Sequence, residues 1–521
     1  FTVIAALLPM AFVGGLMGPY MRPIPINASA GMMISLAVAF VVTPWLAFRL
    51  LGHHEHQAHP VGDAAKPSRI DAFLQRFFKR LMTPFLAGRS ASRKRRMLFA
   101  GMGLLVLLAV GLVGVKAVIL KMLPFDNKSE FQVVLNMPEG STLEQTQRVL
   151  VEMSQVIDKV PEVKDFQIYA GTSAPMNFNG LVRQYYLRNQ PYQGDIQVNL
   201  VDKDERSRQS HEIASSVRPA LAAVAHKYHA HMVLAEVPPG PPVMAPIVAE
   251  IYGPTYRGQR HLAQTMEQMF GKTDGIADIN SSVESSAARR KVFEIDREHA
   301  ATLGVSQAEI VSVLQAAMGG DRATYLGEPG IKYAVPALLR LSPAALASTQ
   351  TILSLRVRSR SGALIPLSEV VKVSDEPWAG AVYHKDLRPY TYVTADDAGS
   401  EDSPIYGMFR LVGKLGAGKV DGHTLTQHFT GAPIGDDHYS ISWSGEWEIT
   451  YETFRDMGIA YSVGLVLIYL LVVGQFRSYL VPLVIMAPIP LTVIGVMPGH
   501  WLLGAQFTAT SMIGMIALAG I

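Results

Sequence analysis

The sequence of 521 residues has no cysteine, only 17% charged residues and a net charge of just +3. Without cysteine, the chain has no disulfide scaffold, no thiol chemistry and no thiolate ligand for a metal. The charged fraction is below the roughly 25% of a typical soluble domain. At the same time 49% of the residues are hydrophobic, which excludes an intrinsically disordered chain. The near balance of charge gives no reason to expect nucleic acid as a partner. No Gly-x-x-x-x-Gly-Lys-Ser/Thr phosphate loop is present, so nothing suggests ATP hydrolysis or a bound cofactor.

The hydrophobic residues gather in six long runs. A bilayer core of roughly 30 Å needs about 20 helical residues. We therefore predict six membrane spans, at Phe1–Met17, Ile26–Leu51, Met97–Leu120, Asp456–Gly474, Tyr479–Gly504 and Phe507–Ile521. Their few charged residues, Arg49, Lys116 and Asp456, lie near the ends of the runs, where a long side chain can reach the interface. The first and last runs are short, and we expect the chain to be a fragment of a longer polypeptide.

The segment 52–96 is strongly basic and ends in Arg93-Lys94-Arg95-Arg96, so the positive-inside rule places it in the cytoplasm. The block 121–455 then lies on the opposite side of the membrane. Within 52–96, apolar residues recur at the spacing of one helical face, among basic residues. They are Ile70, Phe73, Leu74, Phe77, Phe78, Leu81, Met82 and Phe85. We expect this helix to lie flat on the bilayer, with packing against a loop domain as the alternative. Four histidines at 53–59 could bind a metal, but without a fixed scaffold we interpret them as a solvated loop and expect no metal site.

The polar block repeats one order of predicted elements. It begins with a strand at Phe131–Met137, a helix that starts at Ser141 with Glu144 completing a capping box, and strands at Val163–Ala170 and Asp195–Val201. A helix at Ser210–His226 and a strand at Met232–Val237 follow, and a similar pattern restarts at Ile247–Tyr252. Two β-α-β-β-α-β patterns predict two ferredoxin-like βαβ subdomains. The predicted fold class is therefore an α-helical transmembrane bundle with an α+β domain outside the membrane.

Short motifs in a fixed order run along nearly the whole chain. They include Leu123-Pro124, Val134–Thr142, Glu294–Arg297, Ala301–Ser306, Gly319-Gly320, Arg356–Arg358, Ile365–Leu367, Trp443–Glu446, Phe476–Ser478 and Pro482. Together they resemble the inner-membrane permease subunit of resistance–nodulation–division (RND) efflux pumps, in particular the acriflavin-resistance (hydrophobe/amphiphile) branch. The resemblance implies a fragment that runs from the fifth span to the start of the tenth.

The resemblance also implies the domain boundaries. Residues 1–51 would form two transmembrane helices, the first truncated, 52–96 the cytoplasmic loop with its interfacial helix, and 97–120 a further helix. Residues 121–245 would form the first pore subdomain of the periplasmic part. The second pore subdomain would comprise 246–318 and 395–455, interrupted by a docking subdomain at 319–394. Residues 456–521 would form three helices, the last truncated.

By this resemblance the protein is a secondary transporter and not an enzyme. It would export hydrophobic or amphiphilic compounds in exchange for protons, in the bacterial inner membrane, as a homotrimer with a periplasmic adaptor and an outer-membrane channel. The proton relay of the family lies on the fourth and tenth spans, outside this chain, so we expect the fragment alone not to pump. Two alternatives are open: a heavy-metal exporter of the same superfamily, for which the 23 methionines offer soft ligands, and a non-transporting scaffold or export-assisting protein.

Candidate substrate residues lie in a loop rich in turn formers, between two predicted strands. In the family, a similarly placed loop switches between two substrate pockets. We therefore expect a switch loop made of Gly171, Thr172, Ser173, Ala174, Pro175 and Asn177, and substrate contacts from Met176, Phe178, Asn179 and Gly180. An ordinary surface loop is the alternative. Met137 and Met244 could face the same cleft, with core packing as the alternative for each.

Overall fold

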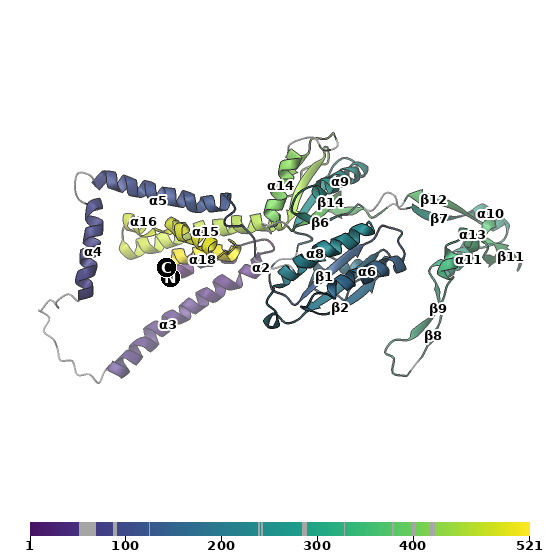
Figure 1. The fold of residues 1–521 in the computed structure, drawn as a ribbon, viewed down its shortest axis with the longest axis horizontal. Coiled ribbons are helices and arrows are strands. Elements are labelled where there is room, and N and C mark those ends of the chain that lie inside the picture. The colour runs from purple at the N-terminus through teal and green to yellow at the C-terminus, as the bar shows by residue number, and fades with distance from the viewer. Residues whose placement is uncertain are drawn as a thin grey trace. The chain divides into compact units, whose positions relative to one another are not determined.

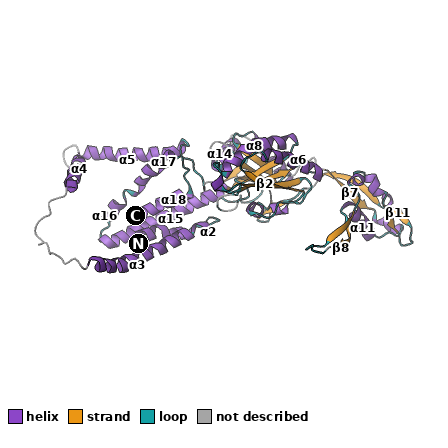
Figure 2. Cartoon of the chain, turned by 60° about the horizontal axis from the view of Figure 1, so that its bottom comes forward, coloured by secondary structure: helices purple, strands orange, loops and turns teal. Residues whose placement is uncertain are grey.

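The computed structural model describes residues 1–51, 69–86, 91–123, 126–237, 240, 243–283, 289–327, 329–377, 380–398, 403–416, 420 and 422–521. The chain divides into two compact units (Figure 1). The larger unit comprises Phe1–Val283 and Ala381–Ile521, and the smaller comprises Glu284–Gly380. In the larger unit, the apolar helices and the mixed α/β part occupy separate regions (Figure 2).

Among the residues that the structure describes, four stretches are long and apolar enough to cross a membrane: Gly18–Leu50, Ala91–Gly114, Glu446–Phe476 and Leu480–Leu502. They contain α2 (Gly18–Met21), α3 (Pro23–Leu51), α5 (Ala91–Gly114), α15 (Glu446–Phe476), α16 (Leu480–Met486), η5 (Ile489–Thr492) and α17 (Val493–Leu502). The other two predicted spans form shorter apolar helices, Thr2–Phe12 and Ala509–Gly520. The first of these contains α1 (Thr2–Leu7) and η1 (Leu8–Phe12), and the second is α18 (Ala509–Gly520).

The first of these short helices packs closely on both α15 and α18. A Cβ atom at Gly464 of α15 would lie 3.0 Å from the carbonyl oxygen of Ala6, and one at Gly520 of α18 would lie 2.7 Å from the Cα of Val3. Small residues at these crossings let the helix backbones approach, as in other membrane bundles. The apolar side chains of α3 and α5 are mostly exposed, as expected for surfaces that meet lipid or protein.

Helix α4 (Arg69–Leu86) forms where the apolar spacing predicts a helix. From Phe73 onward its large apolar side chains are exposed, except for the half-buried Phe85, and the rings of Phe73 and Phe77 stack with centroids 6.3 Å apart. In Figure 1, α4 runs across the direction of α5. An exposed apolar face on an otherwise basic helix suits a position in the membrane interface, which stays a prediction.

The first α/β subdomain has one antiparallel sheet of strand order β2-β3-β1-β4. Its elements are β1 (Glu130–Asn136), α6 (Leu143–Ile157), β2 (Val163–Ala170), β3 (Gln193–Leu200), η3 (Lys203–Glu205), α8 (Ser210–Lys227) and β4 (His231–Ala235). Helices α6 and α8 cover one face of the sheet, over a core that includes Leu135, Leu150 and Ile213. The capping box predicted at Ser141 and Glu144 lies one residue later, at Thr142 and Gln145, because the Ser141 hydroxyl donates to the carbonyl of Pro138 instead.

The second α/β subdomain repeats this arrangement. Its sheet has the order β13-β14-β5-β16-β15, with β6 paired to β14. The elements are β5 (Ile247–Tyr252), α9 (Tyr256–Gly271), β6 (Ile276–Ser281), β13 (Tyr383–Lys385), β14 (Arg388–Asp397), α14 (Pro404–Gly416), β15 (Thr426–His428) and β16 (Ser440–Gly445). The rings of Phe270 and Trp443 stack in its core, with centroids 6.4 Å apart. Strand β16 continues directly into α15.

The smaller unit begins earlier and ends earlier than the insertion predicted at 319–394. It contains β7 (Arg289–Ile295), α10 (Arg297–Thr302), α11 (Gln307–Met318), β8 (Asp321–Leu326), β9 (Val335–Leu339), α12 (Pro343–Leu346), α13 (Thr349–Leu353), β10 (Arg356–Arg358), β11 (Leu364–Pro366), η4 (Leu367–Glu369) and β12 (Val371–Pro377). Ile310 and Leu314 of α11 pack with Val357 and Val370 in its core, so 289–318 belongs here rather than to the second subdomain. Strand β14, at the end of the predicted insertion, pairs with β5 in the larger unit.

Candidate functional site

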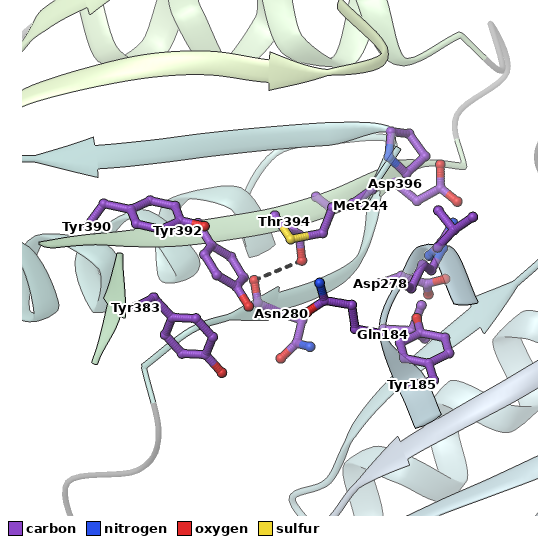
Figure 3. Close-up of a pocket in the computed structure, with 16 residues that line it drawn as sticks. Gln184, Tyr185, Met244, Asp278, Asn280, Tyr383, Tyr390, Tyr392, Thr394 and Asp396 are labelled. Carbon is purple, nitrogen blue, oxygen red and sulfur yellow. Dashed lines mark hydrogen bonds between the residues drawn. The ribbon is translucent and has the colours of Figure 1, made fainter. Parts of the chain in front are cut away.

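The candidate site lies where the two α/β subdomains meet, at the neighbouring edge strands β4 and β6. A cavity of about 270 Å³ opens beside them, which we call the cleft (Figure 3). Its walls come from α7 (Phe178–Val182) and η2 (Tyr185–Leu187), from β4 and the segment 244–246, and from β6, β13 and β14. Both subdomains therefore contribute side chains to one space.

One end of the cleft is aromatic. The ring centroid of Tyr392 lies 5.3 Å from that of Tyr383 and 5.7 Å from that of Tyr390. Burial raises the pKa of Tyr390 to about 12 and the pKa of Tyr392 further, so both phenols are neutral at physiological pH. Met244 lies between this cluster and the polar end (Figure 3). Neutral phenols and a thioether form a wall that accepts apolar groups and still offers hydrogen bonds.

The other end is charged. Arg218 of α8 forms an ion pair with Asp278 of β6, and its Nη2 lies 3.9 Å from Oδ2 of Asp396 on β14. Burial raises the pKa of Asp396 to about 6, although the positive charge of Arg218 opposes the shift. The buried Nε of Arg183, which also lines the cleft, has no hydrogen-bond partner among the described residues. Two cations of the first subdomain thus face two carboxylates of the second.

Of the six residues predicted to bind substrate, the structure brings Met244 to the cleft, with 37% of its surface exposed. Met137 is 7% exposed and belongs to the core of the first subdomain. Met176 and Phe178 are exposed at 63% and 39% and are not among the cleft's lining residues. Asn179 is buried and its Nδ2 donates to the carbonyl of Ala235 at 3.4 Å. The backbone N–H of the sixth, Gly180, donates to Asn177.

The predicted switch loop is anchored to the first sheet. The N–H of Gly171 donates to the carbonyl of Gln193 at 2.8 Å, and the N–H of Ala174 donates to Asp195 at 2.9 Å. Asn177 caps α7, and its Nδ2 donates to Gln197 at 2.9 Å. The predicted run of turns therefore ends in a short helix. These hydrogen bonds fix the position of the chain just before the segment Val182–Tyr185, which lines the cleft.

Asp195 is fully buried at this anchor. Its carboxylate accepts from Nε of Arg188 at 3.0 Å, and the same guanidinium donates to Asn136 and to the carbonyl of Leu135. Burial raises the pKa of Asp195, and Arg188 opposes that shift. Such a pair is costly to break because either partner left alone is a buried, uncompensated charge.

Sequence reasoning missed the tyrosines and the charged end of the cleft. One signal was available: Tyr390, Tyr392, Thr394 and Asp396 alternate along β14, and alternate residues share one face of a strand. The contribution of Arg218 from α8 had no such signal, because it depends on how the two subdomains meet. Among the described residues no group of three His, Cys, Asp or Glu side chains is placed to hold a metal ion. The histidines at 53–59 lie outside the described residues.

Comparisons with known proteins agree with this architecture. A family model described as the AcrB/AcrD/AcrF family matches residues 1–521. The swarming motility protein SwrC of Bacillus subtilis (strain 168) is 20% identical over 521 residues, which are 99% of this chain and 45% of that protein. Two crystal forms of a heavy metal efflux pump match all of this chain and 48% of the pump, with TM-scores of 0.73 and 0.69 and identities of 15% and 17%. The chain thus spans about half the length of these relatives.

Proposed function

Because the chain belongs to the AcrB/AcrD/AcrF family of RND transporters, we propose that it forms about half of the permease subunit of a proton-driven tripartite pump. The pump would export hydrophobic or amphiphilic compounds across the bacterial inner membrane, and the cleft would bind the cargo. The observation that carries this proposal is the two-sided lining of the cleft, with tyrosines and Met244 at one end and paired charges at the other. That lining suits a molecule with an apolar body and a polar group.

The size of the cleft supports a role in binding part of a ligand. Its volume of about 270 Å³ is just below the roughly 300–1,000 Å³ of typical ligand pockets. A drug-sized compound would therefore need the two subdomains to move apart before it is fully enclosed. We also propose that the two α/β subdomains are the pore subdomains of the permease. The segment 171–177 would then be a switch loop beside the cleft.

The smaller unit has a surface suited to binding protein partners. Its β8–β9 hairpin exposes large apolar side chains, among them Tyr325, Tyr333 and Leu339. Exposed apolar groups in one place indicate a surface that another chain covers. We assign this unit as the docking module of a homotrimer that joins a periplasmic adaptor and an outer-membrane channel.

The test is dye efflux by the full-length transporter that contains this chain, in cells without their own exporters. Tyr392→Ala removes an aromatic wall and should raise the steady-state accumulation of ethidium, whereas Tyr186→Ala, at an exposed tyrosine outside the cleft, should leave it at the wild-type level. Phe178→Ala tests the switch loop separately through a changed compound profile. Equal accumulation in the Tyr392 and Tyr186 variants would reject the cleft as the cargo site. If the wild-type protein does not lower the accumulation of ethidium, the result would favour the non-transporting alternative.

A second candidate function is export of a soft metal cation. The observation that favours it is a cluster of five buried methionines in the core shared by the short helices, α15 and the segment after α5: Met10, Met17, Met21, Met122 and Met457. Thioethers suit Cu(I). Replacing Met10 and Met457 with Leu keeps the apolar volume and removes the sulfur, so copper tolerance should fall only if the metal is cargo. Tolerance equal to the wild type, with dye efflux intact, rejects this candidate.

A further inference from the structure

A second cavity lies beside the same junction, on the helix-covered side. Its volume is about 630 Å³, and its lining comes from α8, α9, β4 and β6. The two cavities use neighbouring stretches of the edge strands: Val233 and Asn280 line the cleft, whereas residues 230–232 and 276–279 line the second cavity. Asp278 lines both, so it stands at the boundary between them.

Side chains, rather than a strand ladder, join the two subdomains at this boundary. In the described part of the chain β4 and β6 belong to different sheets and are not paired. Asp278 of β6 instead accepts the N–H of Leu234 of β4 at 2.9 Å and forms the ion pair with Arg218 of α8. The Asp278 side chain is only 4% exposed, and its φ of 51° is unusual for a residue other than glycine. The backbone thus holds a disfavoured conformation where this carboxylate bridges the subdomains.

We propose that Arg218 and Asp278 form a latch that separates the two cavities and holds the subdomains together at the β4–β6 junction. Release of the pair joins the cavities into one passage, through which cargo from the helix side reaches the cleft. The inference rests on the proposed function of the cleft as the cargo site. Because no backbone ladder joins β4 to β6 in the described structure, losing this pair removes one of the side-chain contacts that hold the junction closed.

The groups around the latch make it sensitive to pH. Asp396 and Arg183 face it from the cleft, and Glu236, which accepts from Nδ1 of His211 at 2.6 Å, adds a third carboxylate. On the side of the second cavity, Nδ1 of His231 lies 3.8 Å from Glu267, whose pKa is raised by burial.

Burial and the nearby carboxylate of Asp278 raise the pKa of Asp396 to about 6, so the closed junction binds this proton more tightly than an open, solvated one. Protonation also removes the repulsion between Asp396 and Asp278, so the latch tightens as the pH falls through 6.

The absence of cysteine in this chain allows a direct test by thiol labelling. In the full-length transporter, with any cysteine outside this chain replaced, Val233→Cys reports access to the cleft and Gln350→Cys, exposed on the smaller unit, corrects for the reactivity of the thiol. Asp278→Asn and Arg218→Gln should each raise the corrected rate of labelling by a bulky maleimide about fivefold or more, the effect of losing about 1 kcal/mol. Arg218→Lys, which keeps the charge, should restore most of the protection. Arg148→Gln, at an exposed arginine of α6, should have no effect.

A second arm leaves both latch residues intact. The corrected rate for Val233→Cys should fall between pH 7.5 and pH 5.5, because protonated Asp396 favours the closed junction, and Asp396→Asn should remove that dependence. Labelling that is the same in the wild type, Asp278→Asn and Arg218→Gln overturns the latch, and so does a pH response that persists in Asp396→Asn. The labelling does not require transport. A transporter that exports no dye but shows these changes therefore refutes the proposed function and keeps the latch.

Discussion

Gly445 connects the extramembrane sheet to the membrane, and its replacement by alanine should be severely destabilising. It is the last residue of β16 and the residue that precedes the first turn of α15. Its φ of 83° and ψ of −141° lie in a region that residues with a Cβ atom avoid. A Cβ at this position would lie 2.6 Å from the carbonyl oxygen of Ala245 and 2.8 Å from that of Pro246. Both are backbone atoms, so no side-chain rotation relieves the clash.

The magnitude follows from two contributions. The disfavoured backbone conformation costs of order 1–3 kcal/mol, and forcing a methyl group into occupied space costs about 1–3 kcal/mol more. Relief would require β5 or α15 to shift, which would strain the hydrogen bond from the N–H of Glu446 to the carbonyl of Pro246, now 3.0 Å. We expect Gly445→Ala to lower the free energy of unfolding by about 2–6 kcal/mol. It should also reduce dye efflux, because α15 no longer follows β16 at the native angle.

The matched control is Gly458→Ala on the same helix. In the described structure no atom outside the neighbouring helix backbone lies within 4 Å of a Cβ at Gly458. Alanine is favoured over glycine in a helix by about 1 kcal/mol, so this variant should be neutral or stabilising. The assay is thermal unfolding of the detergent-purified transporter. Ethidium efflux is measured in cells as a second readout. Equal melting temperatures for the two variants would refute the reasoning, since they would show that the close backbone contacts at Gly445 carry no cost.

Three further predictions concern the extramembrane part. Arg188→Met leaves Asp195 as an uncompensated buried charge and should cost about 3–5 kcal/mol of stability, whereas Arg148→Met, on the exposed face of α6, should change the melting temperature little. The pKa of Asp396 is raised from its ordinary value near 4 to about 6, so its ionised form is disfavoured in the folded state: as the pH rises from 4 to 6 the protein should lose roughly 1–3 kcal/mol, and pH-dependent melting of Asp396→Asn should lack this loss. Thr142→Ala removes the capping box of α6 and should cost about 1 kcal/mol in the same melting assay, while an unchanged melting temperature would show that the cap adds nothing.

Much of the architecture could be predicted from local patterns. The apolar runs predicted α3, α5 and α15, and the i, i+3, i+4 spacing predicted α4, because both signals depend only on residues close in sequence. The element order of the first subdomain was also visible. The limits of the inserted unit were not, because they follow from the pairing of β7 with β12, between residues about eighty positions apart.

The cleft shows more clearly which features follow from local sequence and which depend on tertiary packing. The sequence by itself determined the apolar helices, the repeated β-α-β-β-α-β order and the place of Met244 as a candidate, since period and composition carry that information. It did not distinguish Met137, whose side chain is buried in the core of the first subdomain, from Met244, which lines the cleft. Only the tertiary structure decided that Arg218 meets Asp278 across the junction of two separate sheets. The physical reason is that a side chain's partner across a subdomain boundary depends on how two cores pack together, and no local period records that packing.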